Sequence, residues 1–175
     1  MMRDVSVRTR LDEDLPGCAR ALAAVHAADG YPACWPADPV GWLDPPGLAA
    51  AWVVEHAGDI AGHVGMVRDL DDPALAALTG VPAHGSASVT RLFVAPPARG
   101  RGVGARLLDQ VSRCAEEQGL QLVLDVVEDG GPAVALYERL GWRLVDHRLA
   151  DWTTPDGHRL PMRIYLAPEQ PSHMP

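Results

Sequence analysis

The chain has 175 residues, of which 47% are hydrophobic, enough to bury the core of one domain and too much for a disordered chain. Its formal net charge of −8 argues against a general nucleic-acid-binding protein. No apolar run is long enough to cross a bilayer, and the first residues, Met-Met-Arg-Asp, do not resemble a signal peptide. The three cysteines are odd in number and widely spaced, which indicates reduced thiols. We therefore expect a cytoplasmic protein with one domain at residues 1–167 and a C-terminal tail at 168–175.

The first half of the chain alternates segments of strand and helix character. Alternating apolar residues indicate strands, and apolar residues three and four apart indicate a helix. Gly30 is a typical helix end, and Gly58-Asp59 is the signal of a two-residue hairpin turn. The expected elements are a strand at 5–9, a helix through 18–26, an irregular and partly helical segment at 31–50, strands at 51–56 and 60–67, and a loop at 69–85 with a helical turn at 73–78.

The second half continues this alternation. Apolar residues spaced as on one helix face run from Val103 to Ala115, and Gly141 is a typical end for a shorter helix. The expected elements are a strand at 88–95, the helix that follows residue 102, a strand at 120–127, a helix at 132–140, and strands at 142–149 and 160–166 joined by a turn at 155–157. This order of elements predicts an α/β fold with a mixed sheet.

Residues 99–105 read Arg-Gly-Arg-Gly-Val-Gly-Ala, between the expected strand and the expected central helix. Glycine lets backbone N–H groups approach a ligand without a Cβ in the way. A helix N-terminus adds unpaired N–H groups and a partial positive charge. Five of the 15 arginines fall within residues 91–113, so the turn is locally basic. We expect it to bind a pyrophosphate.

A dinucleotide-binding site is one alternative, because Gly100-x-Gly102-x-x-Ala105 matches that fingerprint and Asp125 lies where a ribose-binding acid is expected. However, the chain places five residues, including Pro96-Pro97, where the fingerprint needs a tight turn. Too little chain follows for a six-stranded dinucleotide fold. The phosphate-binding loop of nucleotide triphosphatases is excluded because the chain has no lysine.

The segment 94–108 resembles the acyl-CoA-binding motif of the GNAT superfamily of acetyl-CoA-dependent N-acetyltransferases, whose core is Arg/Gln-x-x-Gly-x-Gly/Ala. Here that core is Arg99, Gly102 and Gly104. Residues 129–142 resemble a second family motif, Asn-x-x-Ala-x-x-Leu-Tyr-x-x-x-Gly-Phe. The resemblance implies the GNAT fold, with a mixed, mostly antiparallel sheet of about six to seven strands flanked by about four helices. It also implies acetyl-CoA as co-substrate and no metal.

The resemblance further implies roles for individual residues. Tyr137 is the motif tyrosine, which protonates the departing thiolate. A backbone N–H near Phe93 and Val94 polarises the thioester carbonyl. The residues expected to bind the cofactor are Phe93, Val94, Arg99, Gly100, Arg101, Gly102, Val103, Gly104 and Ala105.

The sequence departs from the family pattern at two positions. Ser88 stands where many relatives carry a glutamate, and serine is a poor base. Gly130 stands where the family often has asparagine. A water relay or another residue must then serve as the general base, and the candidates are His63, His84 and Asp69. The departures leave a second hypothesis open, a non-catalytic acyl-CoA-binding regulator of the same fold, although Tyr137 favours the enzyme.

The acceptor is expected to be a primary amine of a small molecule or peptide, with no nucleic acid and no membrane as partner. A homodimer is left open. The regions that face the acceptor in this family carry aromatic and acidic residues, which would suit a cationic amine. The alternative is that the tryptophans close a core and that the acidic loop is simply solvated. The residues concerned are Tyr31, Trp35, Trp42, Asp69, Asp71, Asp72 and Trp152.

Overall fold

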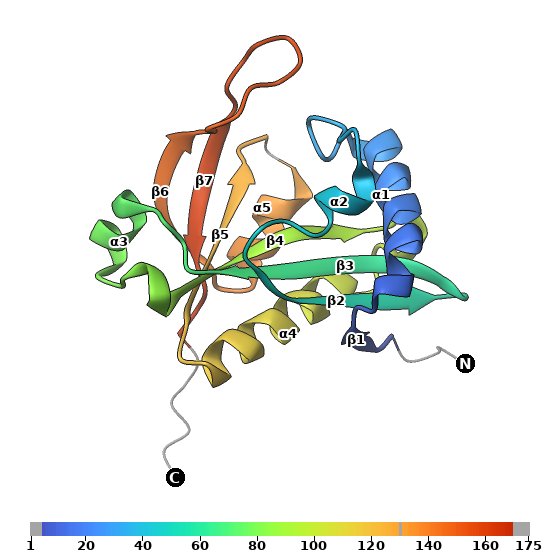
Figure 1. Ribbon diagram of the computed structural model, residues 1–175, viewed down its shortest axis with the longest axis horizontal. Coiled ribbons are helices and arrows are strands. Elements are labelled where there is room, and N and C mark those ends of the chain that lie inside the picture. The colour runs from blue at the N-terminus through green and yellow to red at the C-terminus, as the bar shows by residue number, and fades with distance from the viewer. Residues whose placement is uncertain (1–4, 130, 170–175) are drawn as a thin grey trace.

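A computed structural model describes residues 5–129 and 131–169. Its strands form one seven-stranded sheet in the order β1-β2-β3-β4-β5-β7-β6, with helices on both faces (Figure 1). The strands are β1 (Val7–Thr9), β2 (Leu48–His56), β3 (Asp59–Arg68), β4 (Ser86–Val94), β5 (Gln121–Val127), β6 (Arg143–Leu149) and β7 (Pro161–Leu166). The α-helices are α1 (Leu15–Asp29), α2 (Pro39–Trp42), α3 (Pro73–Thr79), α4 (Val103–Glu117) and α5 (Pro132–Arg139).

This architecture confirms the expected fold. The sheet is mixed and mostly antiparallel, because β4 and β5 are parallel and the other neighbouring strands are antiparallel. The described residues contain five α-helices rather than about four, since the proline-rich segment at 31–50 and the loop at 69–85 each contain a short helix. Both helices begin at a proline that follows an aspartate, and the aspartate side chain caps the first turn.

The hairpin between β2 and β3 turns one residue earlier than expected. His56 pairs with Asp59, so the two central residues are Ala57 and Gly58 rather than Gly58 and Asp59. Both have positive φ values, 53° and 87°. This left-handed pair matches the twist of the flanking strands, and it explains why a glycine stands at the second position.

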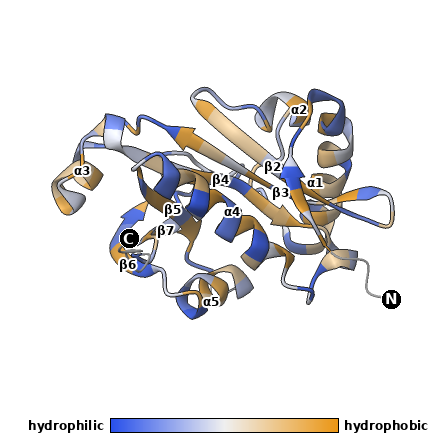
Figure 2. Ribbon diagram, turned by 90° about the horizontal axis from the view of Figure 1, so that it is seen from below, coloured by the Kyte–Doolittle hydropathy of each residue, from blue (hydrophilic) through white to orange (hydrophobic). Residues whose placement is uncertain are grey.

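Two hydrophobic layers cover the two faces of the sheet. In Figure 2 the sheet runs between α1 and α2 on one side and α4 and α5 on the other. The apolar stripe of α4 is buried against one face, as its spacing predicts. Cys18, Leu22 and Val25 of α1 pack on the opposite face with Phe93 and Ala95.

Strands β4 and β5 pair at only one end. Ser86 to Ser88 lie opposite Gln121 to Val123, and beyond these residues the two strands diverge. In Figure 1, β5 rises at a steep angle to β4, so that the sheet opens into a V. Because both strands then present unpaired backbone edges to the gap, this opening is the natural place for a ligand.

The ends of the chain are only partly described. The N–H of Ala167 donates to the carbonyl of Leu122, so the chain stays attached to β5 up to that residue. Residues 170–175 of the expected tail, residues 1–4 and Gly130 lie outside the described residues. Within the described part, none of the helices has the length and hydrophobicity needed to span a bilayer.

Candidate functional site

The glycine-rich turn leads directly into α4, as expected. Gly102 caps the helix with φ 74°, and Gly100 has φ 75°. A side chain is strained at either angle, although the space around both residues is open. The cap residue has no side chain, so the first N–H groups of α4 are left facing outward at the positive end of the helix. This geometry suits a phosphate group.

Gly104 serves a different purpose. A Cβ at this position would lie 3.3 Å from Cδ2 of Leu136 and 3.8 Å from Cγ2 of Val94. The missing side chain therefore lets α4 approach both α5 and β4 closely. Val103, one residue earlier, is buried in the core, so only its backbone can face a ligand, and Ala105 follows in the same helical turn.

Two of the three arginines around this turn, Arg99 and Arg106, are engaged with the protein. The guanidinium of Arg99 pairs with the carboxylate of Asp29 on α1, with one contact of 3.1 Å, and its Nε donates to the carbonyl of Val94 at 3.2 Å. Arg106 donates to the carbonyl of Val5. Arg101 is exposed. In this structure the turn therefore presents backbone N–H groups and the Arg101 charge, whereas Arg99 links the turn to α1.

Phe93 and Val94 lie at the open end of β4. The N–H of Ala95 donates to the carbonyl of Ala61 on β3 at 2.8 Å. Since successive backbone groups alternate in direction along a strand, the N–H of Val94 points away from β3, towards the gap. Phe93 instead faces α1, and its ring stacks on His63 with 5.3 Å between the ring centres.

Tyr137 lies on α5, and only 7% of its surface is exposed. Its ring packs between Trp142 and Tyr165, with centres 6.2 and 6.0 Å away. Burial raises the pKa of its phenol, so the proton stays on the oxygen at neutral pH. The phenol also lies within electrostatic reach of Tyr31 and of Asp125 on β5.

Ser88 stands where the family often has a catalytic glutamate, and His63, His84 and Asp69 are the other candidates for the general base. The four residues lie at different places in the structure. Ser88 lies at the vertex of the V, and its hydroxyl donates to the carbonyl of Val89. Asp69 and His84 lie on the connection from β3 to β4, at the closed end of the V. His63 is fully buried, and burial lowers its pKa to about 4. None of the four combines an accessible basic atom with a place at the open end of the gap.

Asp125 is the acidic residue that matched the dinucleotide-binding alternative, which the length of the turn and the chain argue against. It follows the buried Val123 by two residues on β5, so both share the face opposite α4. Its side chain is exposed. The protein around it still desolvates the carboxylate in part, and this desolvation, together with the charge of Asp151, raises the pKa of the carboxyl. A raised carboxyl pKa beside the opening of two strands is one feature expected of a functional acid or base.

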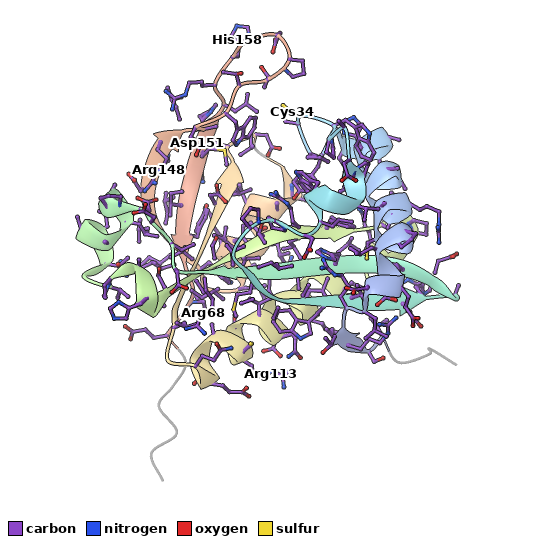
Figure 3. All side chains as sticks on the ribbon, viewed as in Figure 1. Cys34, Arg68, Arg113, Arg148, Asp151 and His158 are labelled. Carbon is purple, nitrogen blue, oxygen red and sulfur yellow. The ribbon has the colours of Figure 1, made fainter. Side chains whose placement is uncertain are left out.

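Two of the four aromatic residues expected near the acceptor are in ring contact. The rings of Tyr31 and Trp42 meet edge to face at 6.2 Å, and Trp35 lies 5.0 Å from the ring of His26. The loop after β6 approaches them, because Sγ of Cys34 contacts the carbonyl of Thr153. In Figure 3, Cys34 and Asp151 lie at the same edge of the molecule, and the exposed Trp152 follows Asp151 on that loop.

The acidic residues expected near the acceptor lie on the connection between β3 and α3. Asp72 caps α3 through the N–H of Leu75 and pairs with Arg148 at 2.6 Å. Asp69 lies at the closed end of the V, and Asp71 is the next acidic residue along the same connection. Two surface cavities lie elsewhere, both against residues 167–169: one of about 500 Å³ beside the C-terminal end of α4, and one of about 310 Å³ beside the start of β6.

The glycine-rich helix start beside two diverging parallel strands is the architecture of a coenzyme-binding acyltransferase domain. The model of the acetyltransferase (GNAT) family matches residues 12–142, and the chain belongs to this family.

Two curated relatives support this assignment. The chain is 31% identical over 182 aligned positions to the mycothiol acetyltransferase of Nocardia farcinica, which covers 95% of this chain and 54% of that protein. It is 30% identical over 101 positions to the uncharacterized N-acetyltransferase YjgM of Escherichia coli, covering 57% of this chain and 54% of that protein. The chain thus spans about half the length of the curated relatives it matches.

Solved structures show the same fold. The ribosomal-protein-S18-alanine N-acetyltransferase of E. coli superposes with a TM-score of 0.69 at 19% identity, over 98% of this chain and 99% of that one. Arabidopsis thaliana NAA60 in complex with acetyl-CoA gives a TM-score of 0.71 at 16% identity, over 93% of this chain and 97% of that one.

Proposed function

We propose that this chain transfers the acetyl group of acetyl-CoA to a primary amine of a small molecule or peptide. The observation that carries the proposal is the open start of α4 at Gly100 and Gly102, beside the open end of β4, where Gly104 lies close to Val94. Within the described residues no cluster of three or more metal-binding side chains is found. We also propose a cytoplasmic site of action, because Cys18, Cys34 and Cys114 are free thiols.

The residues of the turn fit the cofactor. The backbone N–H groups from Gly100 to Ala105 hold the pyrophosphate, and the gap between β4 and β5 receives the arm that carries the thioester. Bound acetyl-CoA supplies the activated acetyl group. The N–H of Val94 donates to the thioester carbonyl and stabilises the charge that develops on its oxygen.

Proton transfers on the two sides of the gap complete the reaction. Asp125 takes a proton from the attacking amine as the C–N bond forms, because its raised pKa makes it a better base than an ordinary aspartate. Tyr137 donates a hydrogen bond and then its proton to the sulfur as the C–S bond breaks. Holding amine and thioester together in the gap supplies much of the rate enhancement.

The experiment is thiol release from acetyl-CoA in the presence of a panel of primary amines, with the acetylated product identified by mass spectrometry. We expect turnover with at least one class of amine. Tight acetyl-CoA binding without turnover on any amine would favour the non-catalytic regulator instead. Failure to bind acetyl-CoA would contradict both functions.

A further inference from the structure

A bulge in β4 determines where Arg91 points. Between His63 and Gly65, β3 advances two residues while β4 advances three, and Arg91 in the extra segment has φ 53°. Before the bulge, Ala87 and Val89 face α4. The extra residue reverses this alternation, so Arg91 lies on the other face, together with Phe93.

The bulge is held by a buried chain of hydrogen bonds. Nδ1 of His63 lies 2.8 Å from the carbonyl oxygen of Arg91, so this nitrogen carries the proton. Nε2 then accepts from Arg10 at 3.0 Å, and Arg10 also donates to the carbonyl of Leu43 at 2.7 Å. The position of Arg91 is thus fixed by Arg10, which follows β1, by His63 on β3 and by Leu43 at the end of α2.

The side chain of Arg91 is only partly engaged. Its Nε donates to the carbonyl of Trp42 at 3.0 Å, and the guanidinium lies 3.9 Å above the centre of the Trp42 ring. Among residues 5–129 and 131–169, its two terminal nitrogens have no hydrogen-bond partner. Neither of these nitrogens is fully buried, so both donors are open to solvent and to a ligand.

Arg91 and Asp125 lie at the same level on the two strands that form the gap. Ser88 of β4 pairs with Val123 of β5. Asp125 is two residues further along β5, and because the bulge adds one residue to β4, its counterpart on β4 is Arg91, three residues after Ser88. Both residues lie on the face opposite α4. The gap therefore has a cation on one strand and an anion on the other, within electrostatic reach of each other and of the Tyr31 phenol.

We propose that the acceptor is an amino acid or a close analogue, with a carboxylate that binds Arg91 while its amine lies beside Asp125. This inference rests on the proposed acetyl transfer and names its substrate class. The planar guanidinium can bind a carboxylate through two parallel hydrogen bonds, which fixes the distance between carboxylate and amine. The amine is then presented to the thioester.

This proposal replaces the expectation of a cationic acceptor over the tryptophans. One face of the Trp42 ring is already covered by Arg91, so the acceptor cannot make a cation–π contact on that face. A purely cationic amine would also meet the like charge of Arg91 at the entrance. An acceptor that carries both charges matches both residues.

The test compares amino acids with their primary amides, which keep the amine and side chain and lose the carboxylate. We expect kcat/KM of the wild type to favour the acid of the preferred pair by tenfold or more. Arg91→Gln should lower kcat/KM for that acid by about 10–150-fold, the cost of a lost charged hydrogen bond. The amide should change by less than about threefold, because it makes no ionic contact. Arg91→Lys, which keeps the charge and loses the planar pair, should lie in between.

Arg113→Gln is the matched control, since Arg113 is an exposed arginine paired with Asp109 on α4. It should leave both substrates unchanged. A direct binding measurement adds independent support: the carboxylic acid that lacks the amine should inhibit the wild type competitively and the Arg91→Gln protein at least about tenfold more weakly.

Equal kcat/KM values for acids and amides in the wild type would overturn the proposal. An equal loss for both substrates in Arg91→Gln would also overturn it, because it would show that Arg91 only supports the bulge. If no amine at all is acetylated, the proposed function itself fails.

Discussion

His63 and Arg91 are joined by a hydrogen bond of 2.8 Å from Nδ1 of the imidazole to the carbonyl oxygen of the arginine. The bond links β3 to the bulge of β4 in the interior, where His63 has no exposed surface. His63 was one candidate for the general base. In the structure it is a positioning residue, because it fixes the backbone that aims Arg91 at the gap.

The burial of His63 predicts a pH-dependent stability. Its pKa is lowered from 6.5 to about 4 by burial, with the charges of Arg10 and Arg91 acting in the same direction. Between these two pH values the His63 imidazole is protonated in the unfolded chain but stays neutral in the native protein. The free energy of unfolding should therefore fall as the pH drops from about 6.5 to about 4, by roughly 3 kcal/mol in total.

Urea denaturation at a series of pH values measures this effect. His63→Gln should lose stability at neutral pH and should also lose this part of the pH dependence. The matched control is His84→Gln, since His84 is exposed and should leave the slope unchanged. A slope in the His63 variant equal to that of the wild type would show that other groups produce it.

Gly102→Val is expected to abolish tight acetyl-CoA binding. The side chain would stand at the start of α4 where the backbone N–H groups face the pyrophosphate. Calorimetric titration should show a loss of affinity well above tenfold, as for the loss of charged hydrogen bonds of about 1.5–3 kcal/mol each.

Gly80→Val is a close control for this variant. Gly80 ends α3 with φ 70° and open space around it, so the backbone strain of a side chain, at least about 1–2 kcal/mol, is comparable. It should lower the stability and leave acetyl-CoA affinity unchanged. Equal losses of affinity in the two variants would mean that instability, and not the ligand site, is responsible.

The local parts of the site could be predicted from the sequence, and the parts that depend on strand pairing could not. The glycine turn, the apolar stripe of α4 and the helix that carries Tyr137 are encoded in short segments, whose periodicity and glycine positions are visible directly. The face of Arg91 depends on a bulge that is set by pairing with β3, 28 residues away in the sequence. Asp125 becomes its neighbour only through the parallel register of β4 and β5.

Substitution of Arg99 tests whether this side chain leaves Asp29 when acetyl-CoA binds to the turn. The sequence motif predicts that Arg99 contacts the cofactor, yet its guanidinium is paired with Asp29. Arg99→Ala should weaken acetyl-CoA binding by about 1–3 kcal/mol if the arginine moves to the phosphate. Asp29→Asn should then tighten binding by up to about fivefold, because the exposed ion pair that must break is worth at most about 1 kcal/mol. Unchanged affinity in both variants would show that Arg99 only links the turn to α1.

Tyr137→Phe tests the proposed acid. The substitution keeps the ring that packs between Trp142 and Tyr165, so the stability should change little. Turnover should fall by about 10²–10⁴-fold, the usual contribution of a positioned acid, while acetyl-CoA affinity stays within about threefold of the wild type.

Tyr165→Phe is the matched control for Tyr137, because its ring lies 6.0 Å away and its hydroxyl donates to Glu138 at 3.0 Å. Losing this part-buried hydrogen bond, and the one that the hydroxyl accepts from Arg163, should cost about 1 kcal/mol of stability and leave turnover near the wild-type value. The comparison separates a hydroxyl that acts on the sulfur from one that only supports the fold. Wild-type turnover in Tyr137→Phe would show that the thiolate leaves without this proton, and equal losses in the two variants would assign the effect to packing around α5.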